Sequence, residues 1–247
     1  MKYKESSPVK SLYKREVSRY FNIPMYVTNT AFGGILLIII GFILLALGKN
    51  YIYALLSTVD LDGMFKYFTL IIVFIIEFSL ATICTTASSV SLEGKQLWIL
   101  KAHPVATKDI FIAKILLNVT ISSIPGIIGV FIISITIGYI YLPVLILMVI
   151  LSSIITGMIG LMCNLNYPKL EWDNETIPIK QGMSTLVSMG LNIIALNFPL
   201  IIYIMLMGIV YDILALLIVC GVYIIIIILL WYKLKTSGVK KFNELNN

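Results

Sequence analysis

One ionisable residue lies near the middle of a long apolar run, and it is the first candidate for chemistry. Glu77 occupies the segment from about Phe65 to Ala87, between isoleucines and phenylalanines. An ionised carboxylate in a bilayer costs several kcal/mol, so Glu77 should face other helices and be protonated, paired or exposed to a water-filled path. It could belong to a substrate or proton route. It could also form an interhelical hydrogen bond, to Asn192 or Asn197 in a later apolar run.

The second candidate is a loop near 88–109 that combines charges with an apolar turn. The segment L-W-I-L at 97–100 lies among basic residues, and exposed apolar surface of this kind usually marks a contact. A partner protein or the lipid headgroups could cover it, and headgroup anchoring is a common role of residues such as Trp98. The apolar side chains of this turn are Leu97, Trp98, Ile99 and Leu100.

Motifs for catalysis, nucleotide binding and metal binding are missing from the sequence. Gly94 and Lys95 do not form a phosphate-binding loop, because no glycine precedes them at the required spacing and glutamine follows the lysine. The paired aspartates or H-E-x-x-H of intramembrane proteases are absent too, as are the clustered acids of lipid transferases. Cys84, Cys163 and Cys220 are widely spaced in apolar runs and are interpreted as buried hydrophobes. We therefore predict that the chain is not an enzyme and has no cofactor of its own.

The composition places these residues in a membrane. Of the 247 residues, 60% are hydrophobic and 12% are charged, and the mean hydropathy is +1.01. A soluble chain has about a quarter of its residues charged, whereas here the charges form short clusters between long uncharged runs. Lipid must be the solvent for most of the chain. The fold class predicted is an all-α polytopic membrane protein.

Six runs are long enough to cross the hydrocarbon layer, which requires about 20 helical residues. They lie at about 27–47, 65–87, 110–140, 142–165, 183–210 and 213–232. Short connections make hairpins of the third and fourth runs and of the fifth and sixth. The third run is long enough to be tilted or broken at Pro125, and Pro199 predicts a kink in the fifth. Small residues at Ser153, Gly157 and Gly160 predict close packing with a helix of this chain or of a second copy.

Lysine and arginine orient these spans. With six crossings, nearly all basic residues fall on one side, which the positive-inside rule assigns to the cytoplasm together with both termini. They occupy a tail and helix at 1–26, loops near 88–109 and 166–181, and a basic tail at 233–247, which flank or interrupt a transmembrane domain at 27–232. Lys49, Lys66, Asp60 and Asp62 fall on the other side. Lys114 is expected to snorkel to the cytoplasmic headgroups. The net charge of +6 thus reflects topology, and no nucleic-acid partner is expected.

The segment at 8–21 has the pattern of an interfacial amphipathic helix. Pro8 suits the first helical position, and apolar residues recur at helical spacing on one face. That face comprises Val9, Leu12, Tyr13, Val17, Tyr20 and Phe21, while Lys10, Lys14 and Arg15 fall on the other. Such a helix lies along the headgroups. It could serve as a surface anchor or as a docking site for a partner.

Two motifs in the chain are similar to those of a known transporter class. The first is E-G-K at 93–95 with W-I-L-K at 98–101, Pro104 and, in the next helix, Lys114; the second is P-K-L-E-W-D-N-E at 168–175. The first resembles the coupling segment of permease subunits in ABC exporters of the second type, which inserts into a cleft of the ATP-binding subunit. The second resembles a signature of longer exporters from low-GC Gram-positive bacteria. The resemblance is to the C-terminal half of those proteins and covers nearly the whole chain.

The resemblance implies a membrane-spanning permease subunit of an ATP-driven exporter in a bacterial plasma membrane. A separate ABC-type ATPase subunit would bind the ATP, and its closure would move the coupling segment and tilt the helices between inward and outward access. Leu97 and Trp98 would be the apolar anchors of that contact. The coupling loop that the resemblance implies comprises Glu93, Gly94, Lys95, Leu97, Trp98, Leu100 and Pro104. A second membrane subunit or a second copy of the chain would be a further partner. An alternative with the same spans is a non-transporting membrane module, an immunity or sensor subunit that binds a peptide or lipid.

Overall fold

The computed structural model describes residues 7–58, 65–102 and 104–245, which are helical throughout except for connections and one isolated bridge between Met207 and Val210. The elements are α1 (Pro8–Asn22), α2 (Pro24–Thr58), α3 (Phe65–Ala81), α4 (Thr86–Ser89), η1 (Ser91–Gln96), α5 (Leu97–Ala102), α6 (Thr107–Ile137), η2 (Tyr139–Tyr141), α7 (Leu142–Asn166), α8 (Thr176–Lys180), α9 (Met183–Asn197), α10 (Leu200–Leu206), α11 (Asp212–Lys233), η3 (Leu234–Gly238) and α12 (Val239–Glu244). The protein is all-α, as predicted. Asp60 and Asp62 lie outside the described residues, as do 1–6 and 246–247.

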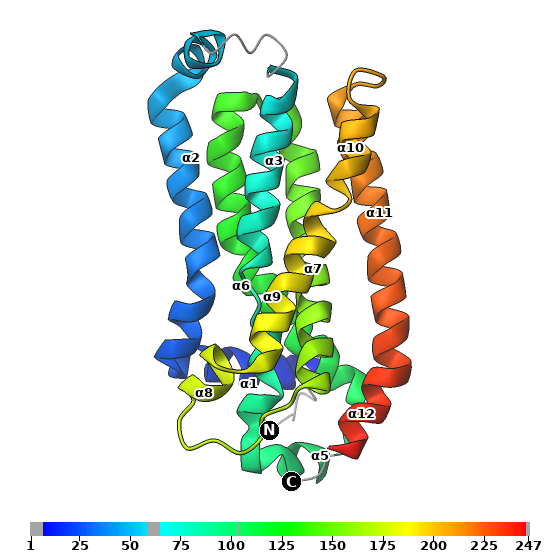
Figure 1. Ribbon diagram of the computed structural model, residues 1–247. Helices are drawn as coiled ribbons and strands as arrows, with labels where there is room; N and C mark the ends of the chain where they lie inside the picture. The colour runs from blue at the N-terminus through cyan, green and yellow to red at the C-terminus, as the bar shows by residue number, and fades with distance from the viewer. Residues whose placement is uncertain (1–6, 59–64, 103, 246–247) are drawn as a thin grey trace, which may run out of the picture.

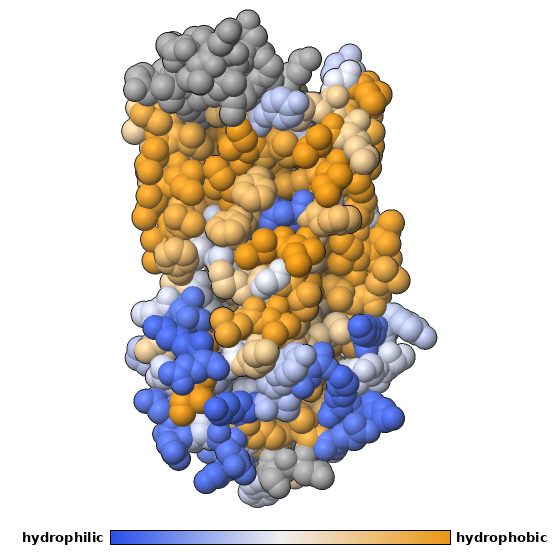
Figure 2. All heavy atoms as spheres, viewed as in Figure 1, coloured by the Kyte–Doolittle hydropathy of each residue, from blue (hydrophilic) through white to orange (hydrophobic). Residues whose placement is uncertain are grey.

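Within the described residues, six helical segments are long and apolar enough to cross a membrane, which confirms the predicted polytopic class. They are Pro24–Gly48, Tyr67–Ala102, Thr107–Ile137, Tyr139–Asn166, Thr176–Leu206 and Asp212–Glu244. The long helices stand side by side, and α1, α5, α8 and α12 lie together at one end, here called the basal end (Figure 1). Hydrophobic residues form a tall band above that end, and hydrophilic residues gather on the end itself (Figure 2). The chain is therefore a multi-pass membrane protein.

Helix α7 is the centre of the bundle and packs against α3, α4, α6, α9 and α11. Its small residues permit the close approach that the sequence predicts. A Cβ added at Gly157 would lie 3.2 Å from the Asn118 side chain, and one at Gly160 would clash with Cys84 and Thr86. The helices packed on these glycines belong to this chain, which resolves one alternative left open by the sequence.

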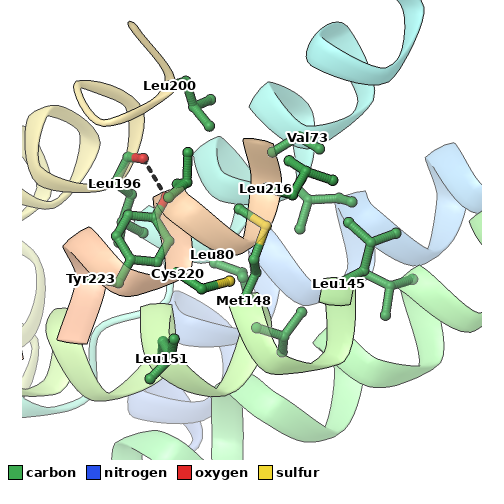
Figure 3. Close-up of a cluster of buried hydrophobic side chains, with 14 of the residues drawn as sticks. Val73, Leu80, Leu145, Met148, Leu151, Leu196, Leu200, Leu216, Cys220 and Tyr223 are labelled. Atoms are coloured by element: carbon green, nitrogen blue, oxygen red, sulfur yellow. Dashed lines mark hydrogen bonds between the residues drawn. The ribbon is translucent and has the colours of Figure 1, made fainter. Parts of the chain in front are cut away.

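The apolar core continues between α3, α7, α9 and α11 (Figure 3). Pro199 interrupts the fifth span between α9 and α10, as predicted, because proline has no N–H to donate. Beside the interruption, the hydroxyl of Tyr223 donates to the carbonyl of Leu196 at 2.6 Å. Tyr223 thus joins α11 to the kink and satisfies a polar backbone group within the bilayer.

The second and third predicted spans are both present. The second is interrupted, because α3 ends at Ala81 and residues 82–85 are not helical. Of the two alternatives for the third span, a tilt or a break at Pro125, the break does not occur, since α6 remains one helix through it. Proline within a membrane helix is tolerated when neighbouring groups accommodate the disturbed backbone.

Helix α1 forms as predicted but is more than a headgroup anchor. It crosses the base of the bundle and packs on α6 (Figure 1). Tyr20 is buried with apolar residues of α2 and α6, and the Tyr13 hydroxyl is hydrogen-bonded to Thr120 at 2.9 Å. Phe21, assigned to the apolar face, is 63% exposed. Arg15, assigned to the solvent face, forms ion pairs inside the protein instead.

Candidate coupling site and intramembrane polar residues

Three of the predicted coupling residues, Leu97, Trp98 and Leu100, lie on a short helix, α5, whose two faces differ in exposure. The residues at 93–95 precede it in η1. Leu97 and Leu100 are buried, whereas Trp98 is 60% exposed and Ile99 is 41% exposed. Neighbouring positions on a helix point to different faces, so one face anchors α5 while the other is presented outward. Leu97 is therefore not available as an exposed anchor, which corrects that assignment. Pro104 is exposed nearby, and Trp98 is the most exposed large apolar side chain of α5.

The buried face of α5 rests on the end of the chain. Leu97 and Leu100 belong to a cluster that includes Phe111 of α6 and Phe242 of α12, and these two rings meet edge to face at 5.7 Å. The Lys101 ammonium donates to the carbonyl of Asn243 at 3.2 Å and to that of Leu245. The predicted basic tail thus packs against the buried face of α5 and supports it.

The segment before α5 is held by a buried asparagine of α7. The Asn164 side-chain oxygen accepts hydrogen bonds from the amides of Val90 at 2.7 Å and Ser91 at 3.0 Å, and its amide donates to the hydroxyls of Ser91 and Ser184. The Trp172 indole donates to the Ser91 carbonyl at 2.8 Å. The motif at 168–175 is therefore joined to the segment that leads into α5.

Gly94 is required at this contact by its backbone and by its surroundings. Its φ is +50°, and an added Cβ would lie 3.2 Å from the Trp172 ring and 3.3 Å from the Leu170 carbonyl. We expect Gly94→Ala to lower the free energy of unfolding by about 1–3 kcal/mol, the usual cost of forcing such a backbone conformation on another residue. Thermal unfolding of the purified protein in detergent measures this. Gly190→Ala is the control, because nothing lies within 4 Å of a Cβ there; equal loss in both variants would contradict the assignment.

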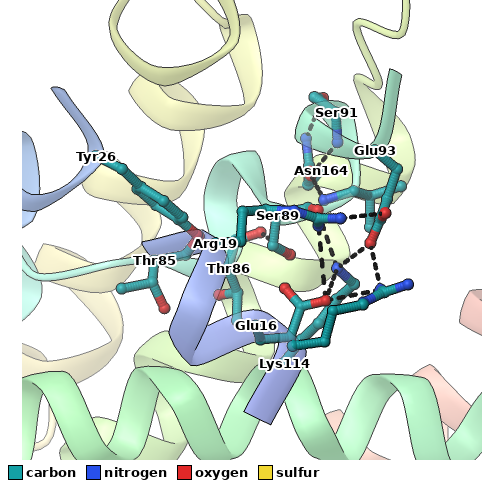
Figure 4. Close-up of polar contacts among 12 residues, drawn as sticks. Glu16, Arg19, Tyr26, Thr85, Thr86, Ser89, Ser91, Glu93, Lys114 and Asn164 are labelled. Carbon is teal, nitrogen blue, oxygen red and sulfur yellow. Dashed lines mark hydrogen bonds and ion pairs between the residues drawn. The ribbon is translucent and has the colours of Figure 1, made fainter. Parts of the chain in front are cut away.

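Glu93 is the centre of an ionic cluster of five side chains, three of which, Glu16, Glu93 and Lys114, are buried (Figure 4). The Lys114 ammonium lies 2.9 Å from Glu93 Oε1 and 3.1 Å from Glu16 Oε1. The Arg15 guanidinium lies 2.9 Å from both carboxylates, and Arg19 lies 2.6 Å from Glu93 Oε2. We call Arg15, Glu16, Arg19, Glu93 and Lys114 the basal ionic cluster. It connects α1, η1 and α6.

The basal ionic cluster corrects two predictions. Lys114 does not snorkel: it is 1% exposed and also donates to the Ser89 carbonyl at 3.0 Å. Glu93 is 4% exposed and so belongs to the support of the loop, not to its outer surface. Burial disfavours the charged form of Arg19, but the hydrogen bond to Glu93 and the charges of Glu16 and Glu93 outweigh it and raise the pKa of Arg19 well above its ordinary value.

No family model, curated protein or solved structure matches the chain. The function must therefore be argued from the geometry and from the motifs. Within the described residues, no group of three histidine, cysteine, aspartate or glutamate side chains is placed to hold a metal ion.

The intramembrane polar residues do not form one site. Glu77 is fully buried and accepts a hydrogen bond from Ser152 of α7 at 2.6 Å. The interhelical hydrogen bond considered from the sequence is therefore present, but its partner is Ser152 and not Asn192 or Asn197. Asn192 donates to the Ala81 carbonyl at 3.4 Å, and Asn197 donates to the Ile193 carbonyl within its own helix at 2.9 Å. Glu77 Oε1 has no hydrogen-bond partner among the described residues.

The Glu77 contact makes a direct test possible. Ser152→Ala removes the hydroxyl that donates to a buried acceptor, and we expect a loss of about 1 kcal/mol, the size measured for such bonds between membrane helices. Glu77→Gln keeps an acceptor for Ser152 and should be tolerated. Thermal unfolding in detergent compares the two. If Ser152→Ala is as stable as the parent, this hydrogen bond does not support the bundle.

Asn118 is a residue that sequence reasoning missed, and it explains the interrupted second span. Its side-chain oxygen accepts from the Thr85 amide at 2.8 Å and from the Thr85 hydroxyl at 3.1 Å. Its amide donates to the Ser153 carbonyl and to the Thr156 hydroxyl of α7. The side chain thus replaces backbone bonds that the non-helical segment lacks. A signal was present, because Lys114 and Asn118 are polar residues one turn apart in an apolar run.

Proposed function

We propose that the chain is the membrane-spanning permease subunit of an ATP-driven exporter of the second ABC type, in a bacterial plasma membrane. In this proposal the basal end faces the cytoplasm and a separate ATPase subunit docks on α5. A second membrane subunit or a second copy of the chain completes the transporter. The observation that carries the proposal is a rigidly supported helix with a tryptophan 60% exposed at its outer face.

The support of α5 fits a part that transmits force. Its inner face packs on α6 and α12, and the segment before it is tied to α7 through Asn164 and to α1 through the basal ionic cluster. A push on α5 would therefore reach several spans at once. A headgroup anchor needs no such connections, since burial of the tryptophan ring in the interface suffices.

The charge distribution supports the orientation. The hydrophilic residues in Figure 2 gather at the basal end, and the exposed basic residues of the described chain there include Lys14, Lys95, Lys108, Lys169 and Lys240. Basic segments close to membrane spans favour the cytoplasmic side. An ATPase that uses cytoplasmic ATP must dock on that side.

The proposal is tested by purifying the tagged chain from its native membrane in mild detergent and identifying the proteins that accompany it. A stoichiometric protein with an ABC-type nucleotide-binding motif is the expected result. Recovery of the chain without any ATPase, under conditions that preserve a known complex of this kind, would argue for the non-transporting module instead.

A further inference from the structure

A cavity of about 440 Å³ lies between α2, the interrupted second span, α8 and α9. This volume is within the range of about 300–1,000 Å³ that is typical of small-molecule sites. Its polar wall includes Thr28 and Asn29 of α2, Thr82 of the non-helical segment, and Thr185 and Ser188 of α9. Non-helical backbone at membrane depth is expected where it lines such a cavity.

The cavity carries one cationic side chain and no acidic one among the described residues that line it. Lys180, at the end of α8, is exposed, and no ion pair within the described residues involves it. Helix α8 packs beside the start of α2 at the basal end (Figure 1). An anionic group that entered from this side would meet a cation that has no competing carboxylate in the cavity.

The depth of the cavity corresponds to the boundary between headgroups and acyl chains. Thr28 and Phe32 are four and eight residues from the first residue of α2, Pro24, so they lie roughly 6 and 12 Å into that helix. Phe32 is 63% exposed and Leu186 of α9 is 64% exposed, and both line the cavity. The opening therefore faces the lipid, with polar groups towards the basal end and apolar groups at its rim.

We propose that this cavity binds the headgroup and glycerol backbone of an anionic glycerophospholipid from the basal leaflet. Lys180 would pair with the phosphate, and Thr28 and Asn29 would hydrogen-bond the glycerol and ester oxygens. Phe32, Leu186 and Met189 would contact the first carbons of the acyl chains. A zwitterionic lipid has the same phosphate, but its own cation would be repelled by Lys180. This site does not depend on the proposed transport function.

The test measures binding of short-chain phosphatidylglycerol and phosphatidylcholine to the purified full chain by native mass spectrometry. One basic residue near a membrane surface contributes about fivefold to the binding of an anionic lipid, so we expect about that preference for phosphatidylglycerol. Lys180→Gln should abolish the preference. Lys169→Gln removes an exposed lysine outside the cavity and should leave it unchanged. Met189→Trp, which fills the cavity, should weaken binding of both lipids.

Three results of the direct binding measurement would overturn the proposal, and a competition measurement supplies a fourth. They are equal binding of the two lipids by the parent, an unchanged preference in Lys180→Gln, and an equal loss in the Lys169→Gln control. Inorganic phosphate and glycerol 3-phosphate are tested as competitors. If either competitor displaces the lipid when the two are present at equal concentration, the site recognises a soluble phosphate and the lipid assignment is wrong.

Discussion

Glu93→Gln will lower the free energy of unfolding by about 3–5 kcal/mol, the usual cost of removing one partner from a buried ion pair. In the parent, two carboxylates and three cations share the basal ionic cluster. The variant leaves Lys114, which is 1% exposed, with Glu16 as its remaining ionic partner in the cluster. Glutamine has nearly the same shape, so the effect reports the lost charge. Thermal or denaturant unfolding in detergent measures it.

Two further variants control this experiment. Glu244→Gln disrupts a surface pair, 3.9 Å from Lys240, and should change stability by less than about 0.5 kcal/mol. The double variant Glu93→Gln with Lys114→Met removes one charge of each sign. Its loss of unfolding free energy should be smaller than the sum of the losses in the two single variants. Additive losses, or a Glu93→Gln variant as stable as Glu244→Gln, would show that the cluster does not hold the basal end together.

Trp98→Ala will weaken binding of the proposed ATPase subunit by about thirtyfold or more, because a buried aromatic at the centre of an interface contributes about 2 kcal/mol or more. The fold should be unaffected, since Trp98 is 60% exposed and Leu97 and Leu100 anchor α5. The measurement is the dissociation constant of the purified subunits in detergent, with thermal unfolding measured alongside.

Tyr211→Ala is the matched control for Trp98. Tyr211 is 88% exposed and lies in the connection between α10 and α11, at the other end of the bundle. Its removal should leave ATPase binding unchanged. Undiminished binding by Trp98→Ala would show that the ATPase does not dock on α5. Weaker binding by both variants would show that the loss is not specific to α5.

The spans could be predicted from the sequence because hydropathy reports directly which segments lipid can solvate. The predicted run at 142–165 and α7 (Leu142–Asn166) nearly coincide. The interruption at 82–85 could not be predicted in this way, because the segment T-I-C-T contains neither proline nor glycine. Its cause lies 33 residues away, in the side chain of Asn118 that binds Thr85.

The candidate site was predicted in part. The loop at 93–104 and the exposure of Trp98 follow from its composition, because an apolar turn among charges is unusual. The basal ionic cluster was missed, since Glu16 and Arg19 each resemble a surface residue when read along the chain, and Lys114 lies close enough to the predicted cytoplasmic boundary to snorkel. Their pairing depends on α1 crossing the base of α6, which no local pattern specifies.

Site-specific photo-crosslinking in native membranes tests directly whether an ATPase docks on α5, with a photoreactive phenylalanine at position 98 and, in a matched protein, at position 211. We expect one crosslinked product from position 98, containing a protein with an ABC-type nucleotide-binding motif, and none with that protein from position 211. Crosslinking of position 98 to lipid alone, or to a protein without that motif, would show that α5 is not the docking site of an ATPase.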